Sequence, residues 1–169
     1  KDLLEALDTP DGKEIKERYL THNLHYAEHD LILNRIKSNG LNNSKDDRVK
    51  VLFVPSYLNG NDGVFNLAYY DLLIGFDMTL FPSYYEPWGY TPMESLAFSI
   101  PTVTTTLTGF GLWVKGEFKK DVEGITVIPR DDFNDREVVT NISKAIMNHC
   151  RLDGEAWLTK RKGAYDISR

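Results

Sequence analysis

The sequence predicts an α/β protein with a Rossmann-like parallel sheet and flanking helices. Two observations favour this class. Short apolar segments rich in β-branched residues alternate with stretches of helical periodicity, and turn residues separate the two kinds of segment. This alternation is typical of parallel βαβ units in a doubly wound sheet. The 169 residues are enough for one hydrophobic core, so we expect residues 1–169 to form a single domain.

The N-terminal segment is predicted to be helical. Residues 1–19 are charged and contain a turn signal at Thr9–Gly12, which predicts two short helices. A further helix is predicted over residues 29–37, and Gly40 is suited to end it. The apolar residues at helical spacing in this helix are Leu31, Ile32, Leu33 and Ile36.

Four short apolar segments are predicted to be buried strands, over residues 49–54, 78–81, 101–105 and 125–128. Ligands of such sheets bind beyond the carboxyl ends of the strands. We therefore expect a binding site in the loops that follow these segments.

Helices are predicted over residues 66–76, 91–98 and 155–165, and another is predicted behind a capping box at Asn134–Glu137. Asn66 would cap the first of these helices. Its inward face would consist of Leu67, Tyr70, Leu73 and Ile74. The helix behind the capping box would bury Val138, Val139, Ile142, Ala145 and Ile146.

Composition excludes several classes of protein. The chain is 41% hydrophobic and 27% charged, which is the balance of a soluble globular protein. No apolar run is long enough to span a bilayer, so no membrane partner is expected. The net charge of -5 argues against a nucleic-acid partner. Cys150 is the only cysteine, which favours a reducing cytoplasm as the location.

The histidines raise the question of a metal site. His25 and His29 are one helical turn apart, with His22 and Glu28 nearby. However, the HEXXH order of zinc enzymes is missing, and no fourth ligand lies close in sequence. We expect no metal.

The densest group of candidate site residues lies in residues 81–94, which begin where a strand is predicted to end and finish inside a predicted helix. Thr91, Pro92 and Glu94 fit a capping box with proline at the first helical position. The free N–H groups of such a helix start can bind phosphate. Gly89 would let the backbone approach a ligand closely.

The other side chains of this stretch suit a sugar or a base. Glu86 can accept hydrogen bonds from sugar hydroxyls, and flat aromatic faces are offered by Tyr84, Tyr85, Trp88 and Tyr90. Two structural alternatives stay open. Glu94 could serve only as the partner of Thr91 in the capping box, and the aromatic rings, Tyr84 above all, could be core residues.

These residues carry a resemblance to a known family. Glu86 and Glu94 match the Glu-x7-Glu signature of retaining GT-B glycosyltransferases, and Tyr84–Pro92 is similar to the animal and fungal type of glycogen synthase. The resemblance extends over about residues 20–130. Its further segments are Thr21–Asn23, Asp47–Val51, Ile100–Thr105 and Thr108–Gly111.

The resemblance implies a fold and a role for each matching residue. The chain would be the nucleotide-sugar-binding, C-terminal half of a GT-B enzyme. Glu86 would contact the transferred glucose as the catalytic residue. Donor-binding residues would be Tyr69, stacked on the base, Tyr85, and Trp88, Gly89 and Tyr90 through their backbone, with Thr91 on the distal phosphate and Glu94 on the ribose. The loop Thr108–Gly111 would lie beside the donor or acceptor.

The implied reaction transfers glucose, with retention, from a nucleoside diphosphate glucose to the non-reducing end of an α-1,4-glucan. UDP-glucose is favoured over ADP-glucose, and no cofactor is expected. The family's diphosphate-binding Arg–Lys pair would lie upstream of Lys1, and an N-terminal domain of the same parent chain would complete the site. We therefore expect residues 1–169 to be a fragment that does not catalyse alone.

Two functional alternatives and one structural question stay open. The parent could be a GT-B transferase with another acceptor, or the chain could be a non-catalytic module that binds a nucleotide sugar or a glucan. The intact Tyr84–Tyr90 string argues against the first, and the presence of both Glu86 and Glu94 argues against the second. Without upstream strands, segment 49–54 could pair with 78–81, or exposed edges could drive dimerisation.

Overall fold

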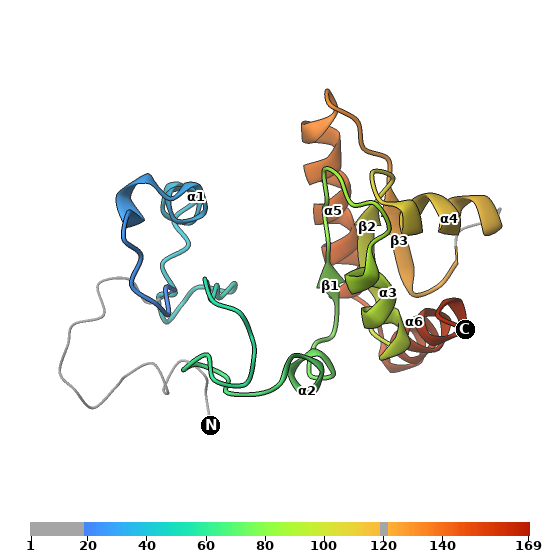
Figure 1. Ribbon diagram of the computed structural model, residues 1–169, viewed down its shortest axis with the longest axis horizontal. Coiled ribbons are helices and arrows are strands. Elements are labelled where there is room, and N and C mark those ends of the chain that lie inside the picture. The colour runs from blue at the N-terminus through green and yellow to red at the C-terminus, as the bar shows by residue number, and fades with distance from the viewer. Residues whose placement is uncertain (1–18, 119–121) are drawn as a thin grey trace. The chain divides into compact units, whose positions relative to one another are not determined.

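The computed structural model describes residues 19–118 and 122–169. The helices predicted within residues 1–19 fall outside this part, apart from Tyr19. The chain divides into two compact units, Lys1–Tyr69 and Tyr70–Arg169 (Figure 1). The single domain over residues 1–169 stays a prediction.

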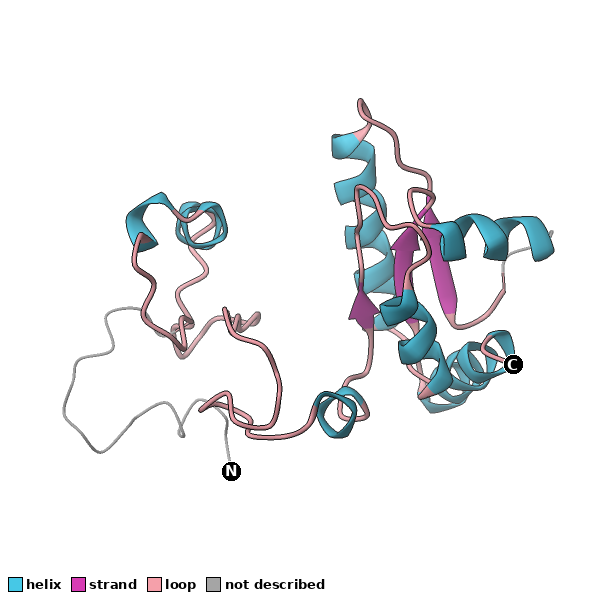
Figure 2. Ribbon diagram, viewed as in Figure 1, coloured by secondary structure: helices cyan, strands magenta, loops and turns pink. Residues whose placement is uncertain are grey.

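The second unit contains a parallel sheet of three strands in the order β1-β2-β3 (Figure 2). The strands are β1 (Thr79–Leu80), β2 (Thr102–Thr105) and β3 (Ile125–Ile128). Helix α3 (Tyr90–Ala97) follows β1, and helix α4 (Gly109–Glu117) follows β2. The parallel sheet with flanking helices confirms the predicted fold class.

Helices cover both faces of this sheet. Figure 1 shows α5 (Asp135–His149) on one face, whereas α3, α4 and α6 (Gly154–Ile167) lie on the other. The core under the three helices is formed by Leu96, Phe110, Val114, Ala164 and Ile167. The core under α5 is formed by Val103, Ile128 and Val138. Burying each large side chain contributes roughly 1.5–3 kcal/mol.

Strand β2 is buried at every residue although three of its four residues are threonines. The hydroxyl groups in this layer bind one another. The Thr79 hydroxyl lies 2.6 Å from that of Ser95 and 2.9 Å from that of Thr102, which in turn donates to the Ile100 carbonyl. Because these buried groups have partners, they avoid the cost of desolvation without a hydrogen bond. They also tie α3 to the first two strands.

The first unit contains a short 3-10 helix, η1 (Ala27–His29), and helix α1 (Leu31–Ser38). Asp30 caps α1 by accepting from the Leu33 N–H at 2.8 Å. Gly40 follows the helix with a φ of 66°, which confirms it as a stop. The predicted inward face is wrong in part, because Leu31 is 80% exposed and Ile32 is 53% exposed. Leu33 and Ile36 pack with Tyr19.

The strand predicted over residues 49–54 is wrong. Among the described residues, this segment forms one parallel bridge, between Leu20 and Phe53. Its other backbone bonds go to a side chain, since the Asn43 amide both accepts from the Val51 N–H and donates to the Val51 carbonyl. The apolar side chains of this segment are only partly covered, since Val51 and Phe53 pack against the Leu33 and Ile36 core whereas Val49 is 59% exposed.

Helix α2 (Tyr69–Leu73) is much shorter than the helix predicted over residues 66–76. Asn66 does not cap it, because its φ of 51° is left-handed and its side chain accepts from the Gly63 N–H in the preceding turn. The predicted inward face is wrong in part, because Leu73 is buried as predicted but the other three residues are not. Leu72 and Leu73 are buried, whereas Leu67, Tyr70 and Ile74 are exposed.

Three further predictions differ from the structure. Thr108–Gly111 is predicted to be a loop, but Gly109–Gly111 form the first turn of α4. Helix α5 begins as expected, but Asn134 does not form a capping box. Its side chain instead accepts from the Asp131 N–H and donates to the Pro129 carbonyl. Val139, predicted to be inward, is exposed.

No helix of the described residues is both long and apolar enough to cross a membrane.

Candidate functional site

The loop after β1, residues 81–89, lies along the segment that follows β2. The Glu86 N–H donates to the Leu107 carbonyl at 3.1 Å, and the Gly109 N–H donates to the Glu86 carbonyl at 3.2 Å. The Phe110 N–H donates to the Trp88 carbonyl at 2.7 Å. These bonds fix the backbone on both sides of Glu86 at the carboxyl edge of the sheet, where the sequence predicted the site.

The close approach of this loop to α4 requires a glycine. A Cβ atom at Gly109 would overlap the Pro87 carbonyl oxygen and crowd the Trp88 ring. Thr108 caps α4, because its hydroxyl accepts from the Gly111 N–H at 2.9 Å. The segment Thr108–Gly111, predicted to border the donor or acceptor, is therefore the first turn of a helix and holds the Glu86 loop.

The predicted capping box at Thr91 and Glu94 is wrong. Helix α3 begins one residue earlier, at Tyr90, and Gly89 is its N-cap with no side-chain hydrogen bond. The φ of Gly89 is 104°, a left-handed value that turns the chain from the loop directly into the helix. Pro92 is thus the third helical residue, and Glu94 is the fifth.

Helix α3 offers few backbone donors at its start. The Tyr90 and Thr91 N–H groups have no partner within the helix, and Pro92 has no N–H. These two donors and the positive end of the helix dipole favour an anionic group. Thr91 is exposed and Gly89 is buried, so the helix start faces outward through Thr91.

Glu94 has a partner that the sequence did not indicate. The Tyr70 hydroxyl donates to Glu94 Oε1 at 3.0 Å, and the Tyr70 ring stacks on Phe98 with 5.4 Å between centroids. The hydrogen bond to Glu94 and the negative charge of Glu94 raise the pKa of Tyr70 above its ordinary value. This contact fixes one carboxylate oxygen of Glu94.

Glu86 is half-buried and packs against Gly89, where an added Cβ would lie 3.5 Å from Glu86 Cγ. Within the described part of the chain, no group forms a hydrogen bond or ion pair with its carboxylate. The backbone of Glu86 is therefore fixed while its carboxylate stays available to a ligand.

The aromatic side chains around Glu86 differ in exposure. Tyr85 is 81% exposed and Tyr90 is 64% exposed. The Trp88 ring packs edge-on against the buried Phe110 ring at 5.9 Å. The interpretation of Tyr84 as a core residue is wrong, because it is 60% exposed and its hydroxyl group binds a carboxylate.

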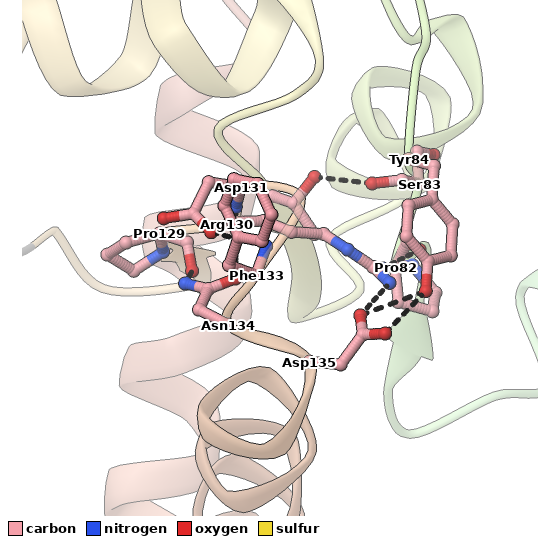
Figure 3. A network of polar contacts seen from close by, with 10 residues as sticks. Pro82, Ser83, Tyr84, Pro129, Arg130, Asp131, Phe133, Asn134 and Asp135 are labelled. Atoms are coloured by element: carbon pink, nitrogen blue, oxygen red, sulfur yellow. Dashed lines mark hydrogen bonds and ion pairs between the residues drawn. The ribbon is translucent and has the colours of Figure 1, made fainter.

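That carboxylate belongs to Asp135, in a cluster that the sequence did not reveal (Figure 3). Arg130, two residues after β3, places its guanidinium over the Tyr84 ring at 3.4 Å from the centroid. The sequence could have indicated Arg130 as a candidate, because it is the first charged residue after the strand predicted over residues 125–128. Ligands of parallel sheets bind at the carboxyl ends of the strands.

Tyr69 is the first residue of α2 and is half-buried. It belongs to the first unit, whereas the Glu86 loop belongs to the second. Its proposed stacking on a base therefore stays a prediction.

The histidine cluster has structural roles in part. The two ring nitrogens of His22 lie 2.7 Å from the Thr21 hydroxyl and 2.9 Å from the Asp62 carbonyl. Asp62 is a second local anchor, since its carboxylate accepts from the Val64 and Phe65 N–H groups. Among the described residues, no three His, Cys, Asp or Glu side chains are grouped to hold a metal.

Comparison with known proteins identifies the family. The model of the family described as glycogen synthase matches residues 15–168. The chain belongs to the glycogen synthase family. It is similar to glycogen [starch] synthase isoform 2 of Saccharomyces cerevisiae, with 43% identity over 110 residues, which are 65% of this chain and 15% of that protein.

Animal relatives match over longer stretches. Glycogen [starch] synthase of Caenorhabditis elegans is 39% identical over 132 residues, 77% of this chain and 19% of that protein. The human liver glycogen [starch] synthase is 35% identical over 149 residues, 88% of this chain and 21% of that protein. These matches confirm the resemblance to the animal and fungal type. The chain spans about a fifth or less of the length of these relatives.

Proposed function

We propose that this chain is the donor-binding part of a retaining glycosyltransferase that elongates glycogen. The enzyme transfers glucose from UDP-glucose to the non-reducing end of an α-1,4-glucan. The observation that supports this most directly is the pair Glu86 and Glu94, set on a loop and the following helix at the carboxyl edge of a parallel sheet, in a chain of the glycogen synthase family.

The proposed roles follow from the chemistry of each group. Glu86 has a fixed backbone and a carboxylate with no partner among residues 19–118 and 122–169, and it accepts hydrogen bonds from the hydroxyls of the transferred glucose. The N–H groups at the start of α3 and the Thr91 hydroxyl hold the diphosphate. Glu94, oriented by Tyr70, keeps its second oxygen for the ribose hydroxyls. Tyr85, Trp88 and Tyr90 line the approach, and Tyr69 stacks on the base.

The proposed reaction needs neither a metal nor a cofactor. The bond between glucose C1 and the diphosphate oxygen breaks as the acceptor hydroxyl oxygen bonds to C1 on the same face. The acceptor proton passes to the leaving diphosphate, which carries away the electron pair of the broken bond. The protein acts by positioning the groups and stabilising the developing charge.

This mechanism places further requirements outside residues 1–169. A GT-B enzyme needs an N-terminal domain of the same parent chain and cationic groups that neutralise the diphosphate. We propose that residues 1–169 bind the donor, that catalysis requires the parent protein, and that the parent acts in the cytoplasm.

Titration calorimetry with UDP, UDP-glucose, ADP-glucose and inorganic phosphate tests the donor site. We expect UDP and UDP-glucose to bind with a Kd of about 1 mM or tighter, and inorganic phosphate to bind more weakly. Glu94→Ala should weaken binding roughly tenfold, because it removes hydrogen bonds to a charged group. Glu137→Ala, which removes an exposed carboxylate from α5, is the matched control and should change nothing.

Tighter binding of ADP-glucose than of UDP-glucose would overturn the proposed donor. Failure of UDP-glucose to bind a folded chain, combined with failure to bind the full parent protein, would overturn the proposed site. Binding by the parent alone would show instead that groups outside residues 1–169 supply most of the affinity.

A further inference from the structure

The cluster of Tyr84, Arg130 and Asp135 joins the loop of residues 81–89 to the start of α5 and has no role in the reaction proposed above. We propose that Arg130 is a positioning residue, which together with Tyr84 and Asp135 holds the loop that carries Glu86 in its binding geometry. This inference rests on the proposed function, because it assigns a role in binding the same donor. The three side chains are called the Arg130 clamp below.

The clamp joins two loops at the carboxyl edge of the sheet (Figure 3). Arg130 Nη1 donates to the Pro82 carbonyl at 2.7 Å, and Nη2 donates to Asp135 Oδ1 at 3.0 Å. The Tyr84 hydroxyl donates to the same carboxylate, at 2.9 and 3.1 Å from its two oxygens. Residue 84 is therefore bound directly to the start of α5, and residue 82 is bound to it through Arg130.

A third loop is attached to the same arginine through its backbone. The Arg130 N–H donates to the Thr106 hydroxyl at 2.9 Å, and that hydroxyl lies 3.3 Å from the Arg130 carbonyl. Thr106 immediately precedes Leu107, whose carbonyl accepts from the Glu86 N–H. Arg130, itself in the segment after β3, thus contacts the segments after β1 and β2, and each of these two segments leads to Glu86.

The environment of the guanidinium is unusual for a purely stabilising ion pair. The Arg130 side chain is 6% exposed, whereas its partner Asp135 is 61% exposed. Arg130 Nε is buried without a hydrogen-bond partner among the described residues. Burying a charge and leaving a donor unpaired both oppose folding. The cluster therefore contributes less to the free energy of unfolding than its number of hydrogen bonds suggests. Its main effect is geometric, since the planar fork fixes the carbonyl, the carboxylate and the ring together.

The short chain between the clamp and Glu86 explains how the geometry is transmitted. Tyr84 is only two residues before Glu86, and Glu86 is itself bonded to residues 107 and 109. A loop fixed at both ends over so few residues has little freedom, and its carboxylate is preorganised for the sugar hydroxyls. Without the clamp, the loop would keep its bonds to residues 107, 109 and 110 and the bond from the Thr105 hydroxyl to the Ser83 carbonyl at 2.8 Å, but residues 82 and 84 would lose their side-chain contacts.

Hydrogen exchange of this chain tests the clamp without a ligand. Arg130→Lys keeps the charge but loses the planar fork, and Tyr84→Phe keeps the ring but loses the hydroxyl group. Both should speed exchange of the Glu86, Gly109 and Phe110 amides roughly tenfold, the equivalent of losing one hydrogen bond to a charged group. Arg136→Lys and Tyr57→Phe, at exposed positions, are the matched controls and should leave these amides unchanged.

UDP-glucose titration of the same variants links the clamp to the proposed site. We expect Arg130→Lys and Tyr84→Phe to bind UDP-glucose roughly tenfold more weakly than the wild type, with a denaturant midpoint close to that of the wild type. The parent enzyme carrying Tyr84→Phe should lose kcat as well as affinity, because Glu86 is displaced from the reacting sugar.

The outcomes separate the two proposals. Suppose that the wild-type chain binds UDP-glucose and that both variants match it in amide exchange and in affinity. This result would overturn the clamp and leave the proposed function intact. Equal acceleration at amides throughout the second unit would also overturn it, since the cluster would then be a general stabiliser. Absence of UDP-glucose binding by the wild-type chain and by the parent would overturn the proposed function and, with it, the positioning role.

Discussion

Helices α3 and α4 both begin at the carboxyl edge of the sheet, but their first turns have different partners. The first turn of α4 is occupied, because its Gly109 and Phe110 N–H groups bind the Glu86 and Trp88 carbonyls. Its N-cap Thr108 satisfies a third donor, the Gly111 N–H. The start of α3 has a glycine N-cap and no side-chain cap.

This difference indicates what each helix start can do. An N-terminus whose donors are bound to the protein's own carbonyls positions a loop, whereas one whose donors have no partner within the helix can bind an anion. We infer that α4 holds the loop of Glu86 and that α3 receives the diphosphate. Substitutions at the two helix starts should therefore affect stability and binding differently.

The largest effect is expected from Gly109→Ala at the start of α4. The added Cβ would overlap the Pro87 carbonyl oxygen, so the loop or the helix must move. Overpacking of this kind costs about 1–3 kcal/mol, measured as the free energy of unfolding in denaturant. Gly116→Ala in the same helix is the control, since its Cβ would meet nothing within 4 Å. Equal destabilisation by both substitutions would contradict the close approach.

A smaller loss of stability, but a larger loss of binding, is expected from Gly89→Ala at the start of α3. Its φ of 104° is unfavourable for alanine, at a cost of about 1–2 kcal/mol. The added Cβ would also lie 3.3 Å from Pro92 Cγ, which would shift the donors of the first turn. Calorimetry should show UDP-glucose binding reduced beyond detection in a chain that still unfolds cooperatively.

Thr108→Ala should cost about 1 kcal/mol of stability, the usual effect of losing an N-cap hydroxyl. Thr108→Ser keeps the hydroxyl and should recover most of that loss, as measured by the denaturant midpoint. Because α4 is inferred to position rather than bind, UDP-glucose affinity should fall only slightly in Thr108→Ala. A loss of affinity as large as that of Gly89→Ala would place the anion at α4 instead.

The sequence predicted the second unit better than the first for a physical reason. Strand β3 was predicted with its observed bounds, and residues 78–81 and 101–105 contain β1 and β2. Each of these strands pairs in regular register with its neighbour, so the apolar, β-branched segments between turns suffice to find them. Segment 49–54 has the same apolar pattern, but within the part of the chain that the structure describes it forms one bridge. Its backbone partners there are Tyr19, Thr21 and the Asn43 side chain.

The site shows a similar limit. The positions of Glu86 and Gly89 followed from the motif and from the strand-to-helix order. The contacts of Tyr84 and Glu94 did not, because Asp135 and Tyr70 lie 51 and 24 residues away in sequence. The capping box at Thr91 was wrong because a glycine in the left-handed conformation made a side-chain cap unnecessary. Contacts between loops depend on the tertiary fold, which local patterns do not encode.

The smallest effect is expected from the hydrogen bond between Tyr70 and Glu94. That bond and the nearby negative charge raise the pKa of Tyr70, so its stabilising effect is complete below the ordinary tyrosine pKa, near 10, and is lost as pH rises through the raised value. Ultraviolet titration of tyrosinate should show one tyrosine ionising later in the wild type than in Glu94→Gln, and Tyr70→Phe should remove that component. If the late component persists in Tyr70→Phe, another tyrosine carries it, and Glu94 is then oriented by something other than Tyr70.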